Sequence, residues 1–310
     1  MSKSSWVVRA SVMLVLMVCV TLAVDAQGVG RAFVSVRGVN TDPCSYLQPC
    51  RTFGRALEVL QAGGEIVVLD SGGYGAATIN KSCSIFVPLG IHASVSPASG
   101  DGLIIAAGAT DTVLIRGLNM SAKGGVNGIN VTSVGVLYVD NCQISNFSAD
   151  GIRFTAPNAL LVVKDTEIRD AGMAGLYLAN ADPIKAFVTR CNFSGCESGV
   201  EIDGQSSLVV SDSSASNNVN GFVVNNTSSA PAVMTLSQAR AVNNTNGVIT
   251  SASGSGAANL SFVYSLMSQN SVGLSVGAGA VARGSNPGTT AISGNTTDVS
   301  GVLSEAATLY

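Results

Sequence analysis

Residues 151–198 read GIRFTAPNALLVVKDTEIRDAGMA followed by GLYLANADPIKAFVTRCNFSGCES, and these two segments are copies of one unit. Each copy opens on a glycine and an alternating apolar triplet, runs through a second alternating stretch, and ends in a small polar turn. The opening glycine recurs every 22 to 26 residues, at Gly102, Gly128, Gly151, Gly175, Gly199, Gly221, Gly247 and Gly273. A period of this length predicts a solenoid, in which one unit buries its apolar face only by stacking on the next.

Aligning the units on this glycine places like residues at fixed positions. The first strand of a unit contributes inward pairs such as Ile152 and Phe154, and the second strand contributes pairs such as Leu161 and Val163. A column of mostly small residues and a further apolar column follow. Such columns indicate parallel strands stacked in register. Three short strands per unit predict an all-β fold, a right-handed parallel β-helix, because parallel crossovers are right-handed by strong preference.

The composition agrees with this fold class. The chain of 310 residues has only 11% charged residues and contains 35 glycines, which favours short strands and tight turns. The turn that ends each unit is rich in asparagine, a residue that tolerates left-handed backbone and can stack as a hydrogen-bonded ladder. These asparagines are Asn146, Asn217, Asn218, Asn243, Asn244 and Asn270.

The first 26 residues are predicted to be a cleaved secretory signal. A basic start is followed by the apolar run Ala10–Val24 and by small residues up to Ala26. The run is shorter than the ~20 residues of a spanning helix, so we expect no membrane span once the signal is removed. The remaining chain has 14 basic and 18 acidic residues, a net charge of −4, which argues against nucleic acid and anionic membranes as partners. We therefore expect a secreted or periplasmic protein, or one on the cell surface.

Residues 27–63 are expected to form an N-terminal cap. A short strand at Phe33–Val36 is followed by a cysteine loop and an amphipathic helix, with Thr52 as its N-cap and Gly63-Gly64 as its stop. The apolar face of the helix consists of Phe53, Ala56, Leu57 and Leu60. A single helix placed here would cover the open end of the β-helix, which we assign to residues 64–310 together with a C-terminal tail.

Six cysteines remain after removal of the signal. Cys44 and Cys50 lie in the short loop DPCSYLQPC with a proline beside each, and we predict a disulfide between them. Cys142 and Cys191 occupy equivalent positions two units apart, which corresponds to ~9.6 Å at the usual strand spacing and is too far for a disulfide. They are read as small core residues, and the pairing of Cys83 and Cys196 is left open.

The leader FVSVRGVNTDPCSYLQPCRTFGRALEVLQAGGEIVVLDSGGYG, residues 33–75, resembles the N-terminal cap of secreted bacterial members of the pectin-lyase-like superfamily. The repeat resembles the right-handed β-helix of the same superfamily, so the resemblance extends over the whole mature chain. It implies the fold and not the activity, because the superfamily includes lyases, hydrolases, epimerases, phage tailspikes and non-catalytic surface proteins.

The outward column of the first strands contains the candidate ligand contacts. Arg153, Tyr177 and Glu201 follow one another on successive coils, Asn130 precedes them, and Asp203 lies two residues after Glu201. An arginine, an aromatic ring and two carboxylates could bind a sugar chain by charge pairing and ring stacking. The carboxylates could also act as an acid and base pair or as calcium ligands.

The motifs of known enzymes of the superfamily are mostly missing. Polygalacturonase-like members carry Asn-x-Asp, Asp-Asp, Gly-His-Gly and Arg-x-Lys, whereas this chain has one histidine, His92 in GIHAS, and no Asp-Asp. The Asp-Pro-His-Glu motif of alginate-epimerase-like members is absent. Arg153, Glu201 and Asp203 are a reduced version of the calcium cluster of pectate-lyase-like members.

Two hypotheses follow from these residues. The first is a secreted, non-catalytic β-helix that binds polysaccharide or a cell-surface component, or serves as an envelope scaffold, without a cofactor. The second is a polysaccharide lyase or related enzyme that acts on an acidic polymer. There, Arg153 would be the base or charge neutraliser, with Glu201 and Asp203 as the acid and base pair or as Ca²⁺ ligands. A groove with long walls around these residues would favour the enzyme, and an open sheet would favour binding.

Overall fold

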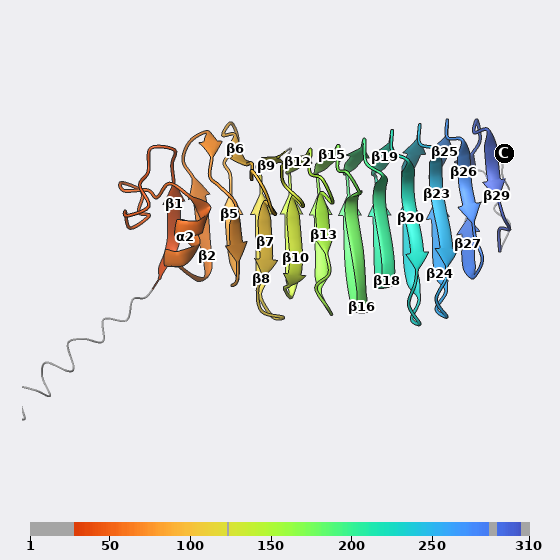
Figure 1. Cartoon of the computed structure of the whole chain (residues 1–310), viewed down its shortest axis with the longest axis horizontal. Coiled ribbons are helices and arrows are strands. Elements are labelled where there is room, and N and C mark those ends of the chain that lie inside the picture. Colours follow the sequence, from red (N-terminus) through yellow and green to blue (C-terminus); the bar gives the residue numbers. More distant parts are fainter. Residues whose placement is uncertain (1–27, 123, 285–289, 305–310) are drawn as a thin grey trace, which may run out of the picture.

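The computed structural model describes residues 28–122, 124–284 and 290–304, which form one elongated stack of parallel strands (Figure 1). The predicted signal, residues 1–26, and the last six residues of the predicted C-terminal tail lie outside the described residues. Within the described part, the only helix has seven residues, and none is long and apolar enough to cross a membrane.

Three strands per coil form three faces of the stack. On the first face, each strand pairs with its equivalent in the next coil, and the same holds on the second and third faces. The first and second faces together form one 19-stranded sheet, because β16 (Ala174–Thr189) and β18 (Ser198–Ser211) each continue from the first face into the second. The third face is a separate 10-stranded sheet.

The remaining strands are assigned to the faces by their pairing. The first face has β4 (Ala77–Ile79), β7 (Leu103–Ala106), β10 (Ile129–Ser133), β13 (Ile152–Phe154), β20 (Asn220–Asn226), β23 (Asn246–Ala252), β26 (Val272–Val276) and β29 (Thr297–Ser300). The second has β1 (Val29–Val34), β2 (Leu60–Val68), β5 (Cys83–Phe86), β8 (Thr112–Arg116), β11 (Val136–Asp140), β14 (Leu160–Lys164), β21 (Ala232–Ser237), β24 (Ala258–Val263) and β27 (Ala280–Gly284). The third has β3 (Gly72–Gly73), β6 (Ala93–Val95), β9 (Leu118–Ser121), β12 (Gln143–Ser145), β15 (Glu167–Arg169), β17 (Asn192–Ser194), β19 (Ser214–Ser216), β22 (Arg240–Val242), β25 (Leu266–Ser268) and β28 (Ala291–Ile292).

The predicted inward columns are confirmed in register. On the first face, Ile152 pairs with Leu176 and Leu176 with Val200, and all three are fully buried. On the second face, Leu161 pairs with Ala186. Each coil therefore covers the apolar residues of the coil before it, and the core is a continuous column along the axis.

The recurring glycine is explained by the distance between successive coils. A Cβ placed on Gly151 would lie 2.6 Å from the carbonyl oxygen of Gly175, and a Cβ on Gly175 would lie 2.6 Å from that of Gly199. Real Cβ atoms do not approach an oxygen this closely. Any larger residue at this position would force the coils apart, so the glycine column sets the spacing of the stack.

The corners between faces are made by residues with left-handed backbone. In the regular coils, one such residue follows the second-face strand, as at Asn141, Asp165, Arg190 and Asp212, and from β12 to β25 another follows the third-face strand, as at Asn146. The predicted asparagine ladder is also present and buried. Its members donate from side-chain and backbone nitrogen atoms to the amide oxygen of the next coil in the series Asn218, Asn244, Asn270 and Asn295.

The cap contains the predicted helix, α2 (Phe53–Val59), but the helix ends earlier than expected. Thr52 is its N-cap and accepts from the backbone nitrogen of Arg55. Leu60 is extended and begins β2, which pairs with β1, so Gly63-Gly64 lie in a strand and do not stop the helix. The helix contacts β1, β2 and β4 at the N-terminal end of the stack, the position of a cap (Figure 1).

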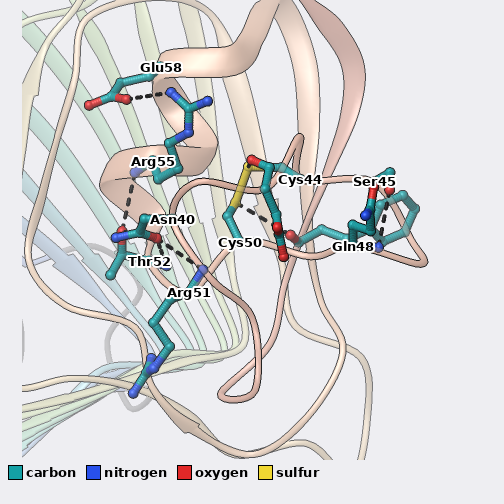
Figure 2. The surroundings of a disulfide bond; sticks show 11 residues. Asn40, Cys44, Ser45, Gln48, Cys50, Arg51, Thr52, Arg55 and Glu58 are labelled. Atoms are coloured by element: carbon teal, nitrogen blue, oxygen red, sulfur yellow. Dashed lines mark hydrogen bonds and ion pairs between the residues drawn. A yellow bond between two sulfur atoms is a disulfide. The ribbon is translucent and has the colours of Figure 1, made fainter.

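The predicted disulfide between Cys44 and Cys50 is confirmed, with Cα atoms 4.6 Å apart (Figure 2). The side chain of Asn40 closes the same loop, because its Oδ1 accepts from the backbone nitrogens of Arg51 and Thr52. The other described cysteines are Cys83, Cys142, Cys191 and Cys196, which are free and buried. Burial raises the pKa of the Cys142 thiol to about 12 and that of Cys191 to about 11, as expected of core residues.

Gly175→Ala should destabilise the protein by about 1–3 kcal/mol, because the added Cβ overlaps the carbonyl oxygen of Gly199 and the ring of Phe193. Gly54→Ala is the matched control, since its Cβ would meet only the Thr52 hydroxyl at 4.0 Å in a helix that favours alanine. Guanidinium unfolding measures both changes. Equal stability of the two variants would contradict the role of the glycine column.

The double variant Cys44→Ala, Cys50→Ala should lose about 2 kcal/mol of stability, because the disulfide closes a short loop in the unfolded chain. Unfolding is measured with and without dithiothreitol. The reductant should destabilise the wild type to the level of the variant and leave the variant unchanged. A wild type insensitive to the reductant would argue against a stabilising bond.

Candidate functional site

The residues predicted as ligand contacts lie together on the first face, and we call Asn130, Arg153, Tyr177, Glu201 and Asp203 the first-face patch. Asn130 pairs with Arg153, Arg153 with Tyr177, and Tyr177 with Glu201, so the first four are neighbours on successive strands. Asp203 lies two residues beyond Glu201 in β18. All five are partly exposed.

Arg153 is held by contacts within the protein. One of its terminal nitrogens, Nη1, lies 3.1 Å from Oδ2 of Asp150, a carboxylate that is only 2% exposed. The guanidinium carbon lies 4.9 Å from the centroid of the Tyr177 ring, which is cation–π geometry. Arg153 therefore neutralises a buried carboxylate and covers part of the aromatic ring that was expected to stack on a sugar.

Two other members of the patch are also bound internally. Asp203 accepts from the backbone nitrogens of Gly204 and Thr227 and from the hydroxyl of Thr227. Asn130 donates to Asp101 over 2.7 Å. These hydrogen bonds hold the two side chains against the turns that flank the sheet.

Glu201 differs from its neighbours because it makes no ion pair in the described part of the chain. Burial raises its pKa above the ordinary value of 4.5, and the charges of Asp150, Asp203 and Glu197 raise it further, while a hydrogen bond from Ser198 opposes the shift. Burial also raises the pKa of Tyr177, helped by the charges of Asp203 and Glu201. Because a raised pKa makes a carboxyl easier to protonate than an ordinary glutamate, Glu201 is the group of this patch best suited to act as a proton donor.

The calcium ligands considered for this patch do not form a cluster. Among the described residues, no three His, Cys, Asp or Glu side chains converge as metal ligands. Glu201 and Asp203 could supply oxygen atoms, but Ca²⁺ takes six to eight. The patch therefore presents two acidic side chains on one strand without a cluster of metal ligands in the described residues.

A larger concave surface lies at the corner between the second and third faces. It consists of two adjoining hollows of about 770 and 360 Å³ that share Asp165 and Glu167. We call it the corner groove. One rim is formed by the left-handed corner residues Asn141, Asp165, Arg190, Asp212 and Gln238, and the other by the outward residues of the third face, Asn119, Gln143, Glu167, Asn192, Ser214 and Arg240.

One bidentate ion pair crosses between coils in this groove. Nε and Nη2 of Arg190 lie 2.6 and 2.9 Å from the two carboxylate oxygens of Asp165, and these bonds hold the pKa of Asp165 below its ordinary value. By contrast, Glu167, Asp212 and Arg240 make no ion pair and no side-chain hydrogen bond within the described residues. The exposed His92 lines the other end of the groove.

The sequence reading missed Asp150 and the corner groove. Asp150 belongs to a second ladder in the position before the recurring glycine, in which Asp101 accepts from Asn127, Asn127 from Asp150, and Asp150 from the backbone of Ala174. The repeated Asp or Asn before glycine was a visible signal of this ladder. The groove was harder to predict from the sequence. Residues Lys164–Asp170 have the pattern of an ordinary solvent-exposed strand, and the sequence does not reveal that Asp165 has left-handed backbone and makes a corner there.

Comparison with protein families matches residues 100–297 to the family described as "Right handed beta helix region". No match was found among curated proteins. The family match covers the regular coils, from the first unit with an opening glycine to the last strand, and supports the right-handed parallel β-helix predicted from the repeat.

Similar solved structures include pectate lyase Pel9A, with a TM-score of 0.63 and 14% identity over 84% of this chain and 78% of that chain. The complex of XylC with xylose has a TM-score of 0.63 and 8% identity over 81% and 68% of the two chains. The A-module of the Azotobacter vinelandii mannuronan C-5 epimerase AlgE4 has a TM-score of 0.56 and 13% identity over 78% and 90%. At these identities the likeness establishes the fold alone.

Glu201→Gln should stabilise the protein at neutral pH and leave it unchanged at about pH 3. Because the pKa is raised in the folded state, folding disfavours the charged form. This penalty is absent below the pKa of the unfolded chain and complete above the raised value. Unfolding free energies across this range measure it, with the exposed Asp182→Asn as control. A variant less stable than the wild type at pH 7 would show that the charge of Glu201 is instead favourable.

Proposed function

The chain belongs to the right-handed β-helix family, and from this premise we propose that it is a secreted, non-catalytic protein that binds an extracellular polysaccharide. The candidate contacts are the members of the first-face patch, which lie along the axis of the stack. A linear polymer could lie across successive coils there, with Tyr177 and Glu201 at the centre of the contact.

The observation that carries the non-catalytic reading is the internal binding of Arg153. A base must accept a proton, whereas the guanidinium of Arg153 is engaged in an ion pair with the buried Asp150, which would be left without a positive partner. Asp203 is likewise occupied by donors from Gly204 and Thr227. The patch could offer a ligand hydrogen bonds and the edge of the Tyr177 ring. Its candidate base, Arg153, is already paired with Asp150.

Different observations support secretion and a carbohydrate ligand. The disulfide between Cys44 and Cys50 is of the kind that persists in oxidising compartments, which agrees with the predicted signal. The similar solved structures are named for pectate lyase, for a mannuronan epimerase and for a complex with xylose. All three names concern carbohydrates, which favours a carbohydrate ligand for this chain.

A second function, a polysaccharide lyase or related enzyme acting on an acidic polymer, is favoured by one observation. The raised pKa of Glu201 makes this carboxyl a candidate general acid in a patch where perturbed groups gather. Calcium would then have to be bound by Glu201 and Asp203 together with the ligand, because these two side chains alone provide few oxygen atoms.

The test uses the chain without its predicted signal and a panel of acidic and neutral polysaccharides, with and without calcium. We expect binding to at least one polymer and no new unsaturated or reducing ends. Tyr177→Ala should weaken binding by about tenfold, the scale of a lost stacking contact. Product formation that is abolished in Glu201→Ala would establish the enzyme instead, and absence of any binding would refute the proposed function.

A further inference from the structure

The corner groove has the length and direction of an extended polymer site. Its third-face rim runs through six successive coils, from Asn119 to Arg240, with each residue paired to the next. At the usual strand spacing of ~4.8 Å, the six coils span ~24 Å along the axis. Each of the six coils adds a polar side chain to the third-face rim, and all but the first, which has Gly117 at the corner, add one to the corner rim.

The floor of the groove cannot bind a ligand through the backbone. The backbone nitrogens of Glu167, Asn192, Ser214 and Arg240 donate to carbonyl oxygens one coil away over 2.9 to 3.1 Å. A peptide therefore has no free edge to extend as an added strand. Recognition in the groove must use the side chains of the two rims.

The charges of the groove exclude a uniformly charged polymer. Arg190 and Asp165 neutralise each other, and the side chains left without partners in the described part of the chain are Glu167 and Asp212, which are acidic, and Arg240, which is basic. An anionic chain would meet the two acidic side chains, and a cationic chain would meet Arg240. A ligand with many hydroxyl groups and no charge can both donate to the carboxylates and accept from the guanidinium.

We propose that the corner groove binds a linear, uncharged glycan that lies parallel to the axis of the stack. Hydroxyl groups recur on every ring of such a chain, as the rim side chains recur on every coil. Glu167 and Arg240 bind its hydroxyl groups at separate coils, and Asn192 and Ser214 lie between them. This inference goes beyond the proposed function, because the groove lies at the corner between the second and third faces, whereas the first-face patch lies on the first face.

The test measures binding of neutral hexasaccharides, β-1,4-linked glucose, xylose and mannose, to the whole chain without its predicted signal by calorimetry, with hexagalacturonate as the anionic comparison. At least one neutral hexasaccharide should bind more tightly than hexagalacturonate. Glu167→Ala and Arg240→Ala should each weaken this binding by about tenfold, as expected for a lost hydrogen bond to a charged group. Both residues lie in strands and make no side-chain hydrogen bond or ion pair within the described residues, so the variants should fold, which thermal unfolding checks.

The controls separate this site from the first-face patch. Phe187→Ala, an exposed aromatic residue on the second face, should leave neutral glycan binding unchanged, and Glu201→Ala reports separately on the first-face patch. Absence of neutral binding at millimolar concentration, or its persistence in the double variant Glu167→Ala, Arg240→Ala, would overturn the proposal. Binding lost only in Glu201→Ala would also overturn it while supporting the proposed function.

Discussion

The close approach of successive glycines is the constraint on which the rest of this structure depends. A Cβ on Gly151 or Gly175 would lie 2.6 Å from a carbonyl oxygen of the next coil, so one position in every unit must lack a side chain. With that position fixed, the strands that follow are brought into register, and Ile152, Leu176 and Val200 fall into one buried column. The hydrophobic effect then acts along the whole axis, since each coil is covered only by its neighbours.

The turns must satisfy the polar groups that this stacking buries. Asn244 accepts from the backbone and side-chain nitrogens of Asn218 and donates to Asn270, and Asp150 accepts from the backbone of Ala174. A buried carboxylate such as Asp150 needs a positive partner, and Arg153 provides it. Asp150, a member of the hydrogen-bond ladder in the turns, thus also binds the outward residue Arg153. Arg153 stabilises the fold through this ion pair, and a ligand would have to compete with it.

The fold could be predicted because each inward position recurs in several copies of the repeated unit, so that its apolar character can be recognised in the sequence. The C-terminal end of α2 was predicted wrongly, because Leu60 could belong to the helix or to the strand that follows. Pairing of β2 with β1, which is distant in sequence, places Leu60 in the strand. The alignment of Arg153, Tyr177 and Glu201 followed from the register. Their partners did not, because Asp150 and Thr227 lie in turns whose side-chain directions depend on backbone conformation. The groove depends in the same way on the left-handed backbone of residues such as Asp165.

Much of the hydrogen bonding of the first-face patch is already used within the protein. A ligand at the first-face patch must compete with Asp150 for Arg153 and with Gly204 and Thr227 for Asp203, and an exchange of one hydrogen bond for another brings little net free energy. Glu201 is the exception, since it makes no ion pair within the described residues and its burial disfavours the charged form of its carboxyl. For Arg153 to act as a base it would have to leave Asp150, a carboxylate that is 2% exposed, and an unpaired buried charge is strongly destabilising. The ion pair with Asp150 thus counts against Arg153 as a base.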